Sequence, residues 1–242
     1  MTERPRNAFL RSLSDKSYAQ IKDHLVAVDL SLGAYLQNDE EKTDWVYFPE
    51  NSLLSLIAAS ATGETVETSM AGNEGAGGLT EACGSQISSV DCVVQVDGRA
   101  WRAPAAVCRN LALTESDFNA SAWRLGEMQL VESRQSALCQ AMHPVEQRFA
   151  RWLLESFDRC GGRNPLPMTQ EFLAAMLGVQ RTTVSSFAAG LQRKGLINYR
   201  RGRVEIVDRD GLEGLACDCR KVIVRQRERL GFPTMVTALS PG

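Results

Sequence analysis

Residues 168–197 read MTQEFLAAMLGVQRTTVSSFAAGLQRKGLI, and this stretch decides how the chain is interpreted. Thr169 is suited to cap a helix, with Glu171 in the first turn, where the helix dipole favours an acid. Apolar residues then recur at helical spacing up to Gly178, which suits a sharp turn in a left-handed conformation. A second amphipathic helix follows from Gln180 to Lys194. The stretch therefore predicts a helix-turn-helix.

One face of the second helix carries short or polar side chains, which can approach base edges without a steric penalty. The guanidinium of Arg181 can fork onto guanine, and Gln180 could pair with adenine or contact phosphate. The set of DNA contacts predicted on the two helices is Thr169, Gln170, Gln180, Arg181, Thr182, Thr183, Ser185 and Ser186.

A short hairpin is predicted directly after the helices. Residues 195–207 read as a strand, an Arg-Gly turn and a strand, which indicates a β wing. Its tip carries Arg200, Arg201 and Arg203, which are well placed for phosphates. An ordinary helical hairpin would look the same from its helices alone, so the basic wing is what favours DNA binding.

The charge of the chain is divided unevenly along its length. Residues 1–150 hold 12 Lys and Arg against 20 Asp and Glu, a net −8, whereas residues 151–242 hold 15 against 9, a net +6. Between Phe172 and Val204 there are six basic residues and no acid. Such a segment indicates a nucleic-acid face on one module, with a solvated basic surface as the alternative.

Short β-rich runs bounded by turn residues dominate the first hundred residues, at 44–49, 53–59, 65–70 and 90–96. Asp97-Gly98 follows the last of them and predicts a tight hairpin with residues 99–101. Residues 13–24 predict a short helix capped by Ser14. Many short strands with tight turns predict an antiparallel β barrel or roll, and the whole chain is then of the α+β class.

After Pro104 the pattern becomes helical, with helices predicted at 104–113, 116–142 and 145–158 and a break forced by Pro144. Apolar positions in the long helix step by three and four residues, a heptad seam suited to a partner helix. The same seam would suit a helix lying on its own β domain. The seam consists of Met128, Val131, Gln135, Leu138 and Met142.

This order of elements resembles the Crp/Fnr family of bacterial transcription regulators. The resemblance rests on residues 166–185 (LPMTQEFLAAMLGVQRTTVS), 194–197 (KGLI) and 143–154 (HPVEQRFARWLL), and on 46–49 (VYFP) with 53–56 (LLSL). It implies a jelly-roll-like β roll, a dimerisation helix and a winged helix-turn-helix. It also implies a homodimer that reads a two-fold related operator on double-stranded DNA, with RNA polymerase as a further partner.

The recognition helix departs from the family pattern at two positions. The family often has Ser-Arg-Glu-Thr-Val-Ser/Gly-Arg, and this chain keeps the arginine as Arg181. Thr182 and Ser186 replace the base-reading glutamate and the closing arginine. A shared contact to a G·C pair is therefore expected, within a half-site that differs from the usual one.

The sensor part departs from the cyclic-nucleotide members of the family. A buried phosphodiester needs a cation, and no Lys, Arg or His occurs from Thr43 to Gly98. We therefore predict weak or absent cAMP binding in the usual mode, and the glycine-rich run can equally serve β turns. The candidate effector residues are Gly72, Glu74, Gly75, Gly77, Gly78 and Arg99.

The cysteines favour a reducing compartment, since seven is an odd number in a chain long enough to build its own core. With no signal-peptide pattern and no apolar run of membrane length, we expect a cytoplasmic protein without membrane contact. Cys217 and Cys219 form the one close pair, a candidate redox or metal pair that lacks two further ligands. The first cysteine is Cys83, which does not fit the N-terminal cysteines of an iron–sulfur branch, and no cofactor is expected.

The sequence also bears on two alternatives to a DNA-binding regulator, an enzyme and an interaction module. An enzyme is disfavoured because the sequence has no nucleophile elbow, no phosphate loop with lysine and no histidine-containing metal motif. A ligand-, redox- or protein-interaction module with weak DNA binding stays open because of Thr182 and Ser186. The expected units are a β-roll sensor-like domain (1–113), the dimerisation helix (114–142), the winged helix-turn-helix (143–230) and a flexible tail (231–242).

Overall fold

The computed structural model describes residues 4–232 of the chain. It begins with helices α1 (Ala8–Ser12) and α2 (Asp15–Ile21), followed by a 3-10 turn, η1 (Lys22–His24). Ser14 caps α2 as expected, because its side chain accepts a hydrogen bond from the backbone N–H of Ser17. The helix predicted over 13–24 is therefore confirmed, with its last turn tightened.

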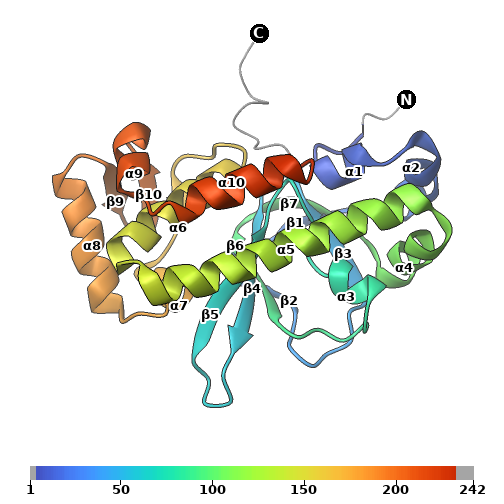
Figure 1. Ribbon diagram of the computed structural model, residues 1–242, viewed down its shortest axis with the longest axis horizontal. Helices are drawn as coiled ribbons and strands as arrows, with labels where there is room; N and C mark the ends of the chain where they lie inside the picture. The colour runs from blue at the N-terminus through green and yellow to red at the C-terminus, as the bar shows by residue number, and fades with distance from the viewer. Residues whose placement is uncertain (1–3, 233–242) are drawn as a thin grey trace, which may run out of the picture.

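The strands form two antiparallel sheets that make up the predicted β roll (Figure 1). One sheet has the strand order β1 (Val26–Leu30), β7 (Gly98–Pro104), β3 (Trp45–Pro49). The other has the order β2 (Tyr35–Gln37), β6 (Asp91–Val96), β4 (Leu53–Ala59), β5 (Thr65–Ala71).

Strands β4 and β6 of the second sheet are buried on both faces over most of their length. Leu54 and Val94 lie in the interior of the roll together with Ala100 of the other sheet. Their chain neighbours Leu53 and Val93 point to the opposite side and pack into the core that also holds the helix-turn-helix. A strand buried on both faces reads as a continuous apolar run, which explains why residues 53–57 read LLSLI.

The prediction of a hairpin at Asp97-Gly98 is wrong. Both strands form, but β6 pairs with β2 and β4, whereas β7 pairs with β1 and β3. Asp97 and Gly98 carry the chain from one sheet to the other. Glycine is needed there because a Cβ at Gly98 would lie 2.6 Å from Asn51 Oδ1 and 3.0 Å from Asn51 O.

Helix α3 (Leu79–Cys83) lies between β5 and β6 in the chain. Three helices follow β7: α4 (Ala105–Thr114), α5 (Ser116–Met142) and α6 (Val145–Arg159). The long helix has the bounds that the sequence predicts, and it runs the length of the molecule in Figure 1. His143 ends α5 and Pro144 precedes α6, which confirms the break. Among the described residues, no helix is both long and apolar enough to cross a lipid bilayer.

The C-terminal part contains β8 (Leu166–Pro167), α7 (Gln170–Leu177), α8 (Arg181–Arg193), β9 (Ile197–Arg200), β10 (Arg203–Ile206), α9 (Arg209–Leu215) and α10 (Cys219–Arg229). The helix-turn-helix and its wing are confirmed. β8 joins the wing as a third strand, in the order β8, β10, β9.

Helix α10 was not expected from the sequence, and it lies along α5 (Figure 1). Arg229 lies 3.1 Å from Glu127, near the middle of α5. Phe232 is still packed into the core that contains α5, with 4% of its surface exposed. Phe232, which was expected to belong to a flexible tail over 231–242, is therefore part of the core, and residues 233–242 lie outside the described part of the chain.

Six buried charged side chains form one connected network of ion pairs where α6 meets the β roll, α5 and α10: Arg151, Arg159, Arg227, Glu74, Glu132 and Glu155. Their charges balance. Arg159 is 1% exposed, pairs with Glu132, lies 3.3 Å from Glu74 and donates to the carbonyl of Met70 at 2.6 Å. Removing one partner of such a buried pair generally costs about 3–5 kcal/mol, so this network fixes how the elements meet.

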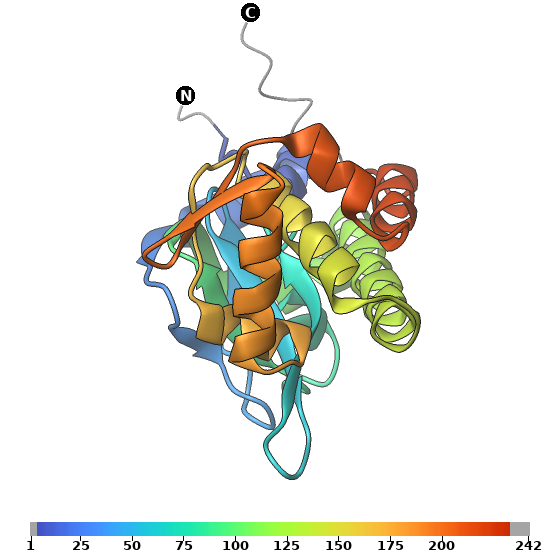
Figure 2. The ribbon, with the colours of Figure 1, turned by 90° about the vertical axis from the view of Figure 1, so that its left-hand side faces the viewer.

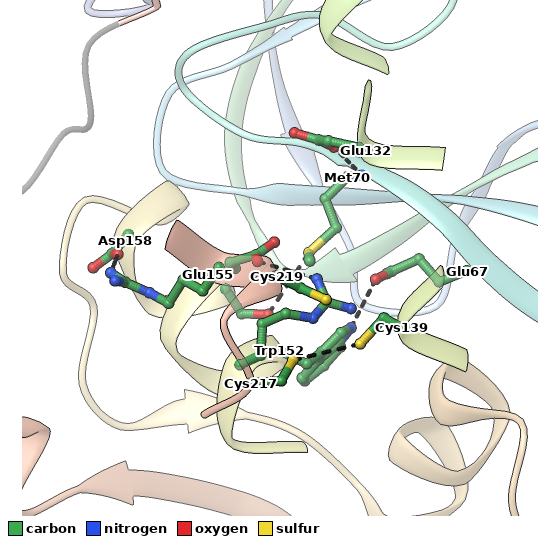
Figure 3. A network of polar contacts seen from close by, with 12 residues as sticks. Glu67, Met70, Glu132, Cys139, Trp152, Glu155, Asp158, Cys217 and Cys219 are labelled. Carbon is green, nitrogen blue, oxygen red and sulfur yellow. Dashed lines mark hydrogen bonds and ion pairs between the residues drawn. The ribbon is translucent and has the colours of Figure 1, made fainter. Parts of the chain in front are cut away.

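A second polar chain crosses the same junction. Trp152 Nε1 donates to Glu67 Oε1 at 2.7 Å (Figure 3), and Ser55 Oγ lies 2.5 Å from Glu67 Oε2 and 2.6 Å from Gln95 Oε1. Gln95 Nε2 donates to Ser156 Oγ at 2.9 Å, which leaves its oxygen as the acceptor. The single proton of Ser55 cannot serve both acceptors, so a protonated Glu67 that donates to Ser55 satisfies every group. Burial agrees with this, because it raises the pKa of Glu67 to about 7.

We expect Glu67→Gln to stabilise the protein above pH 7. In the unfolded chain Glu67 ionises near pH 4.5, whereas in the folded chain it keeps its proton up to about pH 7. The stability of the unmodified protein therefore falls as the pH rises from about 4.5 to about 7, and then stays level. Glutamine keeps both hydrogen bonds without titrating, which should add about 3 kcal/mol at about pH 8. Urea unfolding at about pH 5 and about pH 8 measures the difference.

Glu64→Gln is the matched control. Glu64 is exposed in the turn between β4 and β5, where hydrogen bonds from Ser60 and Thr62 lower its pKa to about 2. It is ionised in both folded and unfolded chains above about pH 5, so this substitution should change stability equally at the two pH values. An equal change for Glu67→Gln at the acidic and the basic pH would contradict a buried neutral Glu67.

Candidate nucleic-acid interface

Helix α7 is held at both ends by the residues that the sequence indicated. The Thr169 hydroxyl accepts a hydrogen bond from the backbone N–H of Phe172 at 3.2 Å. Gly178 ends the helix with φ +63°, in the left-handed region that favours glycine. Arg148 of α6 donates to the carbonyl of Leu177 at 3.1 Å, so the last turn also has a buried partner.

Helix α8 buries one face and exposes the other. Val184, Ala188 and Leu191 are at most 2% exposed and hold the helix against α7 and the wing. The opposite face carries the predicted DNA contacts, of which Gln180, Arg181, Thr182 and Ser186 are exposed and Thr183 and Ser185 are half-buried. Helix α8 lies toward the viewer at the surface of the molecule in Figure 2. The exposed side chains leave this face open in the single chain.

Two contacts order the beginning of α8. Ser185 Oγ donates to Gln170 Oε1 of α7 at 2.6 Å. Arg181 Nε lies 3.0 Å from Glu171 Oε1, and both side chains are more than half exposed. An exposed ion pair of this kind contributes little to stability. It therefore orients the Arg181 side chain but can be broken easily when another partner binds. This pairing was not predicted from the sequence, in which Glu171 was expected only to favour the helix dipole, although both residues lie in the quoted stretch.

The wing presents its arginines from a tight turn. Arg201 and Gly202 have φ values of +49° and +71°, a two-residue hairpin turn with positive φ at both central positions. The side chains of Arg200, Arg201 and Arg203 lie on this turn and the strand ends beside it. The wing strand β9 is anchored by Tyr199, whose hydroxyl donates to the carbonyl of Met168 at 3.0 Å. Burial raises the pKa of Tyr199, so the phenol keeps the proton that it donates.

Residues from α7, α8 and the wing meet around one shallow hollow of about 390 Å³. Four predicted DNA contacts line it, Thr169, Gln170, Arg181 and Arg201, together with Glu171, Tyr199 and Gly202. The hollow lies where the recognition helix begins and the wing turns. A negatively charged backbone that follows this surface would meet Arg181 and Arg201 together.

The glycine-rich run considered for an effector is filled by the protein itself. Residues 71–79 are all buried. A Cβ on Gly72 would lie 2.6 Å from the Cβ of Arg159, whose guanidinium reaches Glu74 at 3.3 Å. Cβ atoms on Gly75 and Gly77 would likewise lie 3.0 Å and 2.8 Å from the side chains of Leu125 and Leu54. These glycines therefore allow close packing around an internal ion pair.

The other two residues of that candidate set are placed differently. Gly78 is the N-cap of α3 and has φ +80°, a left-handed conformation that favours glycine. Arg99 is exposed on β7, and within residues 4–232 no ion pair joins its side chain to Glu74. The cation beside the glycine-rich run is Arg159 of α6, which lies too far along the chain for local sequence reading to connect them.

The heptad seam expected on α5 is divided between the interior and the surface. Met128 is 3% exposed and packs in the same core as Ile223 of α10 and Leu230, which caps that helix. Val131 packs partly against this core. Gln135 is half-buried. Leu138 and Met142 are 48% and 72% exposed. A partner helix could therefore reach the C-terminal end of this seam but not Met128.

A different apolar face of α5 is open. Trp123 is 75% exposed and Leu130 is 47% exposed, one heptad apart on the same side of the helix. With Leu113 of α4, which is 80% exposed, they border a hollow of about 780 Å³ between α3, α4 and α5. The heptad spacing is visible in the sequence, but the sequence alone does not show which of two heptad faces is turned inward.

Cys217 and Cys219 are not an isolated pair. Cys139 and His143, at the end of α5, lie beside them, with 3.5 Å between the sulfurs of Cys139 and Cys217 (Figure 3). Sequence reasoning missed these two neighbours. The available signal was the spacing from Cys139 to His143, which puts both side chains on one face of a helix.

The C-terminal part of the chain matches a known domain family. Residues 147–215 match the family model of the Crp-like helix-turn-helix domain. This segment begins early in α6 and ends with α9, so it contains the whole surface described above. No curated protein matches the chain in overall sequence.

Solved structures show that the architecture of most of the chain is also known. A transcriptional regulator assigned to the crp/fnr family from Eubacterium rectale superposes with a TM-score of 0.67 at 19% identity, covering 87% of this chain and 98% of its own. FixK2 from Bradyrhizobium japonicum gives a TM-score of 0.68 at 14% identity and coverages of 80% and 98%. A CRP family transcriptional regulator from Thermus thermophilus gives 0.64 at 18% identity and coverages of 78% and 96%. At these identities the likeness is one of fold.

Proposed function

We propose that this chain, which carries a Crp-like helix-turn-helix domain and has the fold of the Crp/Fnr regulators, is a sequence-specific DNA-binding transcription regulator. The observation that carries the proposal is the open face of α8, with Arg181 at its start and three arginines on the adjacent wing. In such domains the second helix enters the major groove and reads base edges, while the wing contacts phosphates.

The chemistry of α8 supports a particular mode of reading. Arg181 uses Nε toward Glu171, so its two terminal nitrogens are free to fork onto the O6 and N7 atoms of a guanine. Thr182 and Ser186 are exposed and short, so they can approach a thymine methyl or a phosphate but cannot make a bidentate contact. We therefore propose a half-site that has one guanine read by Arg181 and that differs from the usual half-site of the family.

We expect substitutions of the two arginine groups to act differently. Arg181→Ala should weaken binding to the preferred sequence by about 1–3 kcal/mol and relax the choice at one base pair. Arg200→Ala or Arg203→Ala should weaken binding to all sequences alike and reduce the salt dependence by about one ion each. Fluorescence anisotropy with DNA selected from a random library, and with a scrambled duplex, measures both effects over a range of salt concentrations.

Two further variants complete this test. Arg181→Lys keeps the charge but loses the fork, so it should lose specificity while keeping affinity for scrambled DNA. Arg11→Ala, at an exposed arginine of α1, should change neither measurement. If Arg181→Ala bound the selected DNA as tightly as the unmodified protein, α8 would not be the reading helix.

We propose that the protein acts as a homodimer on a two-fold related operator, with one α8 in each half-site, and that RNA polymerase is a further partner. The open apolar face of α5, with Trp123, Leu130 and Leu113, supports self-association, because such a contiguous patch on a monomer is rarely left uncovered. In a two-fold dimer both subunits use the same surface, so this face of α5 would pack against the same face of α5 in a second copy.

The dimer contact can be assigned by comparing two pairs of substitutions. Trp123→Ala with Leu130→Ala should yield a monomer and lower operator affinity, because the apolar face is then lost. Leu138→Ala with Met142→Ala tests the exposed end of the seam expected from the sequence and should leave the dimer intact. Sedimentation velocity measures both. A monomer from the second pair and a dimer from the first would overturn this choice of face.

We also propose that the protein is not activated by cAMP in the usual mode. The glycine-rich run is buried and its cation, Arg159, is engaged by Glu74, Glu132 and the carbonyl of Met70. A phosphate would have to displace these buried partners. We expect a titration with fluorescent cyclic nucleotide to show no sub-micromolar binding, and saturation in that range would refute the proposal.

A further inference from the structure

Four side chains able to bind a metal meet at the junction of α5 and α10. Cys139 and His143 come from the end of α5, and Cys217 and Cys219 flank the residue that precedes α10. All four donor atoms lie within 4.8 Å of one another. In the described part of the chain, residues 4–232, this is the one group of its kind.

We propose that these residues, Cys139, His143, Cys217 and Cys219, bind one Zn²⁺ ion in a tetrahedral site with three thiolates and one imidazole. In such a site, zinc bonds of about 2.3 Å to sulfur and about 2.0 Å to nitrogen place the donors about 3.5–3.8 Å apart. The sulfurs of Cys139 and Cys217 are 3.5 Å apart, and Cys219 Sγ lies 3.3 Å from His143 Nδ1. The donors thus need only small movements to surround a single ion.

The local backbone explains why four donors converge. Residues 139 and 143 are one turn apart on the same face of α5, and the N–H of His143 still bonds to the carbonyl of Cys139 at 3.1 Å. Asp218 is the N-cap of α10, so Cys217 lies just before the helix and Cys219 is its first residue. Two pairs of ligands from short local motifs, far apart in the chain, are typical of structural zinc sites.

The environment of His143 supports a role as ligand. Its Nδ1 faces Cys219, while its Nε2 lies 3.5 Å from Oδ1 of Asp218. A metal-binding histidine commonly directs its other ring nitrogen to a carboxylate, which fixes the tautomer and the orientation of the ring. Asp218 lies between the two cysteines in sequence, so one tripeptide supplies two ligands and this carboxylate.

Free thiols acting as small core residues explain the arrangement less well. The three cysteines form a buried cluster of their own, with exposures of 1%, 5% and 0%, apart from the large apolar cores. An isolated apolar pocket has no need for a histidine nitrogen in contact with a thiol. A disulfide between Cys139 and Cys217 would leave Cys219 and His143 unused. An iron–sulfur cluster binds its protein ligands through separate iron atoms, which requires a wider spread of donors than a single ion.

A site with four protein ligands is closed, so its role is structural rather than catalytic. It would join the end of α5 to the start of α10 across 78 residues of chain. Cys217 follows α9 closely, so the ion would also fasten the last element of the helix-turn-helix domain to the long helix. Binding consumes one Zn²⁺ and releases the three thiol protons to solvent, which leaves a centre with a net charge of −1.

The test uses the full chain purified under reducing conditions. We expect elemental analysis to find one zinc per chain, and we expect the metal-free protein to bind Co²⁺ with the visible spectrum of a tetrahedral thiolate site. Zinc should protect three of the seven thiols from a thiol reagent, with protection lost on chelation. His143→Ala and Cys219→Ser should each abolish stoichiometric binding.

Cys83→Ser is the matched control, because Cys83 lies in α3 outside the cluster and its loss should keep one zinc per chain. Circular dichroism establishes whether each variant folds, and the thiol-protection assay on the unmodified protein tests the site even if a variant does not. Failure of the reduced, metal-free protein to bind Zn²⁺ or Co²⁺ would overturn the proposal. A Cys139–Cys217 disulfide that persists under reductant, or iron with acid-labile sulfide, would also overturn it.

Discussion

The buried guanidinium of Arg159 is the contact on which the arrangement of this molecule depends. It is 1% exposed and touches the β roll through Met70 and Glu74 and the long helix through Glu132. A buried charge must keep its partners, because an isolated one is far more costly than an unpaired neutral group. Any movement of α6 away from the roll would have to break several of these contacts together.

The glycine-rich run is the other half of that constraint. The backbone and side chain of Arg159 approach Gly72 so closely that a Cβ there would lie 2.6–2.7 Å from them. No cation of this part of the roll takes part, because residues 43–98 contain no Lys, Arg or His. The cation comes instead from α6, the helix that leads into the helix-turn-helix domain. A charge buried beside the glycine-rich run thus holds two parts of the chain together.

The proposed DNA-binding surface depends on this junction indirectly. Helix α6 carries Arg159 on one side and, through Arg148, holds the end of α7 on another. The core shared by Leu53 of the roll and Val184 of α8 extends through the same region. The proposed zinc site adds a second fastening, at the C-terminal end of α5.

The sequence by itself determined those elements whose signals are local. The bounds of α5, the Thr169 cap, the Gly178 turn and the basic wing were all predicted, because caps, glycines and helical periodicity act within a few residues. The open polar face of α8 followed from the same periodicity. So did the β roll as a class, since short apolar runs with turns between them have few other solutions.

Only the tertiary structure decided which elements meet. Asp97-Gly98 has the composition of a hairpin turn, but the partners of β6 and β7 lie elsewhere in the chain, and pairing across sheets is not a local property. Apolar residues of α5 lie on more than one side of the helix, and the packing of α10 buries the side that carries Met128. Arg159 and Glu74, like Cys139 and Cys217, are far apart along the chain, so their chemistry exists only where folding brings them together.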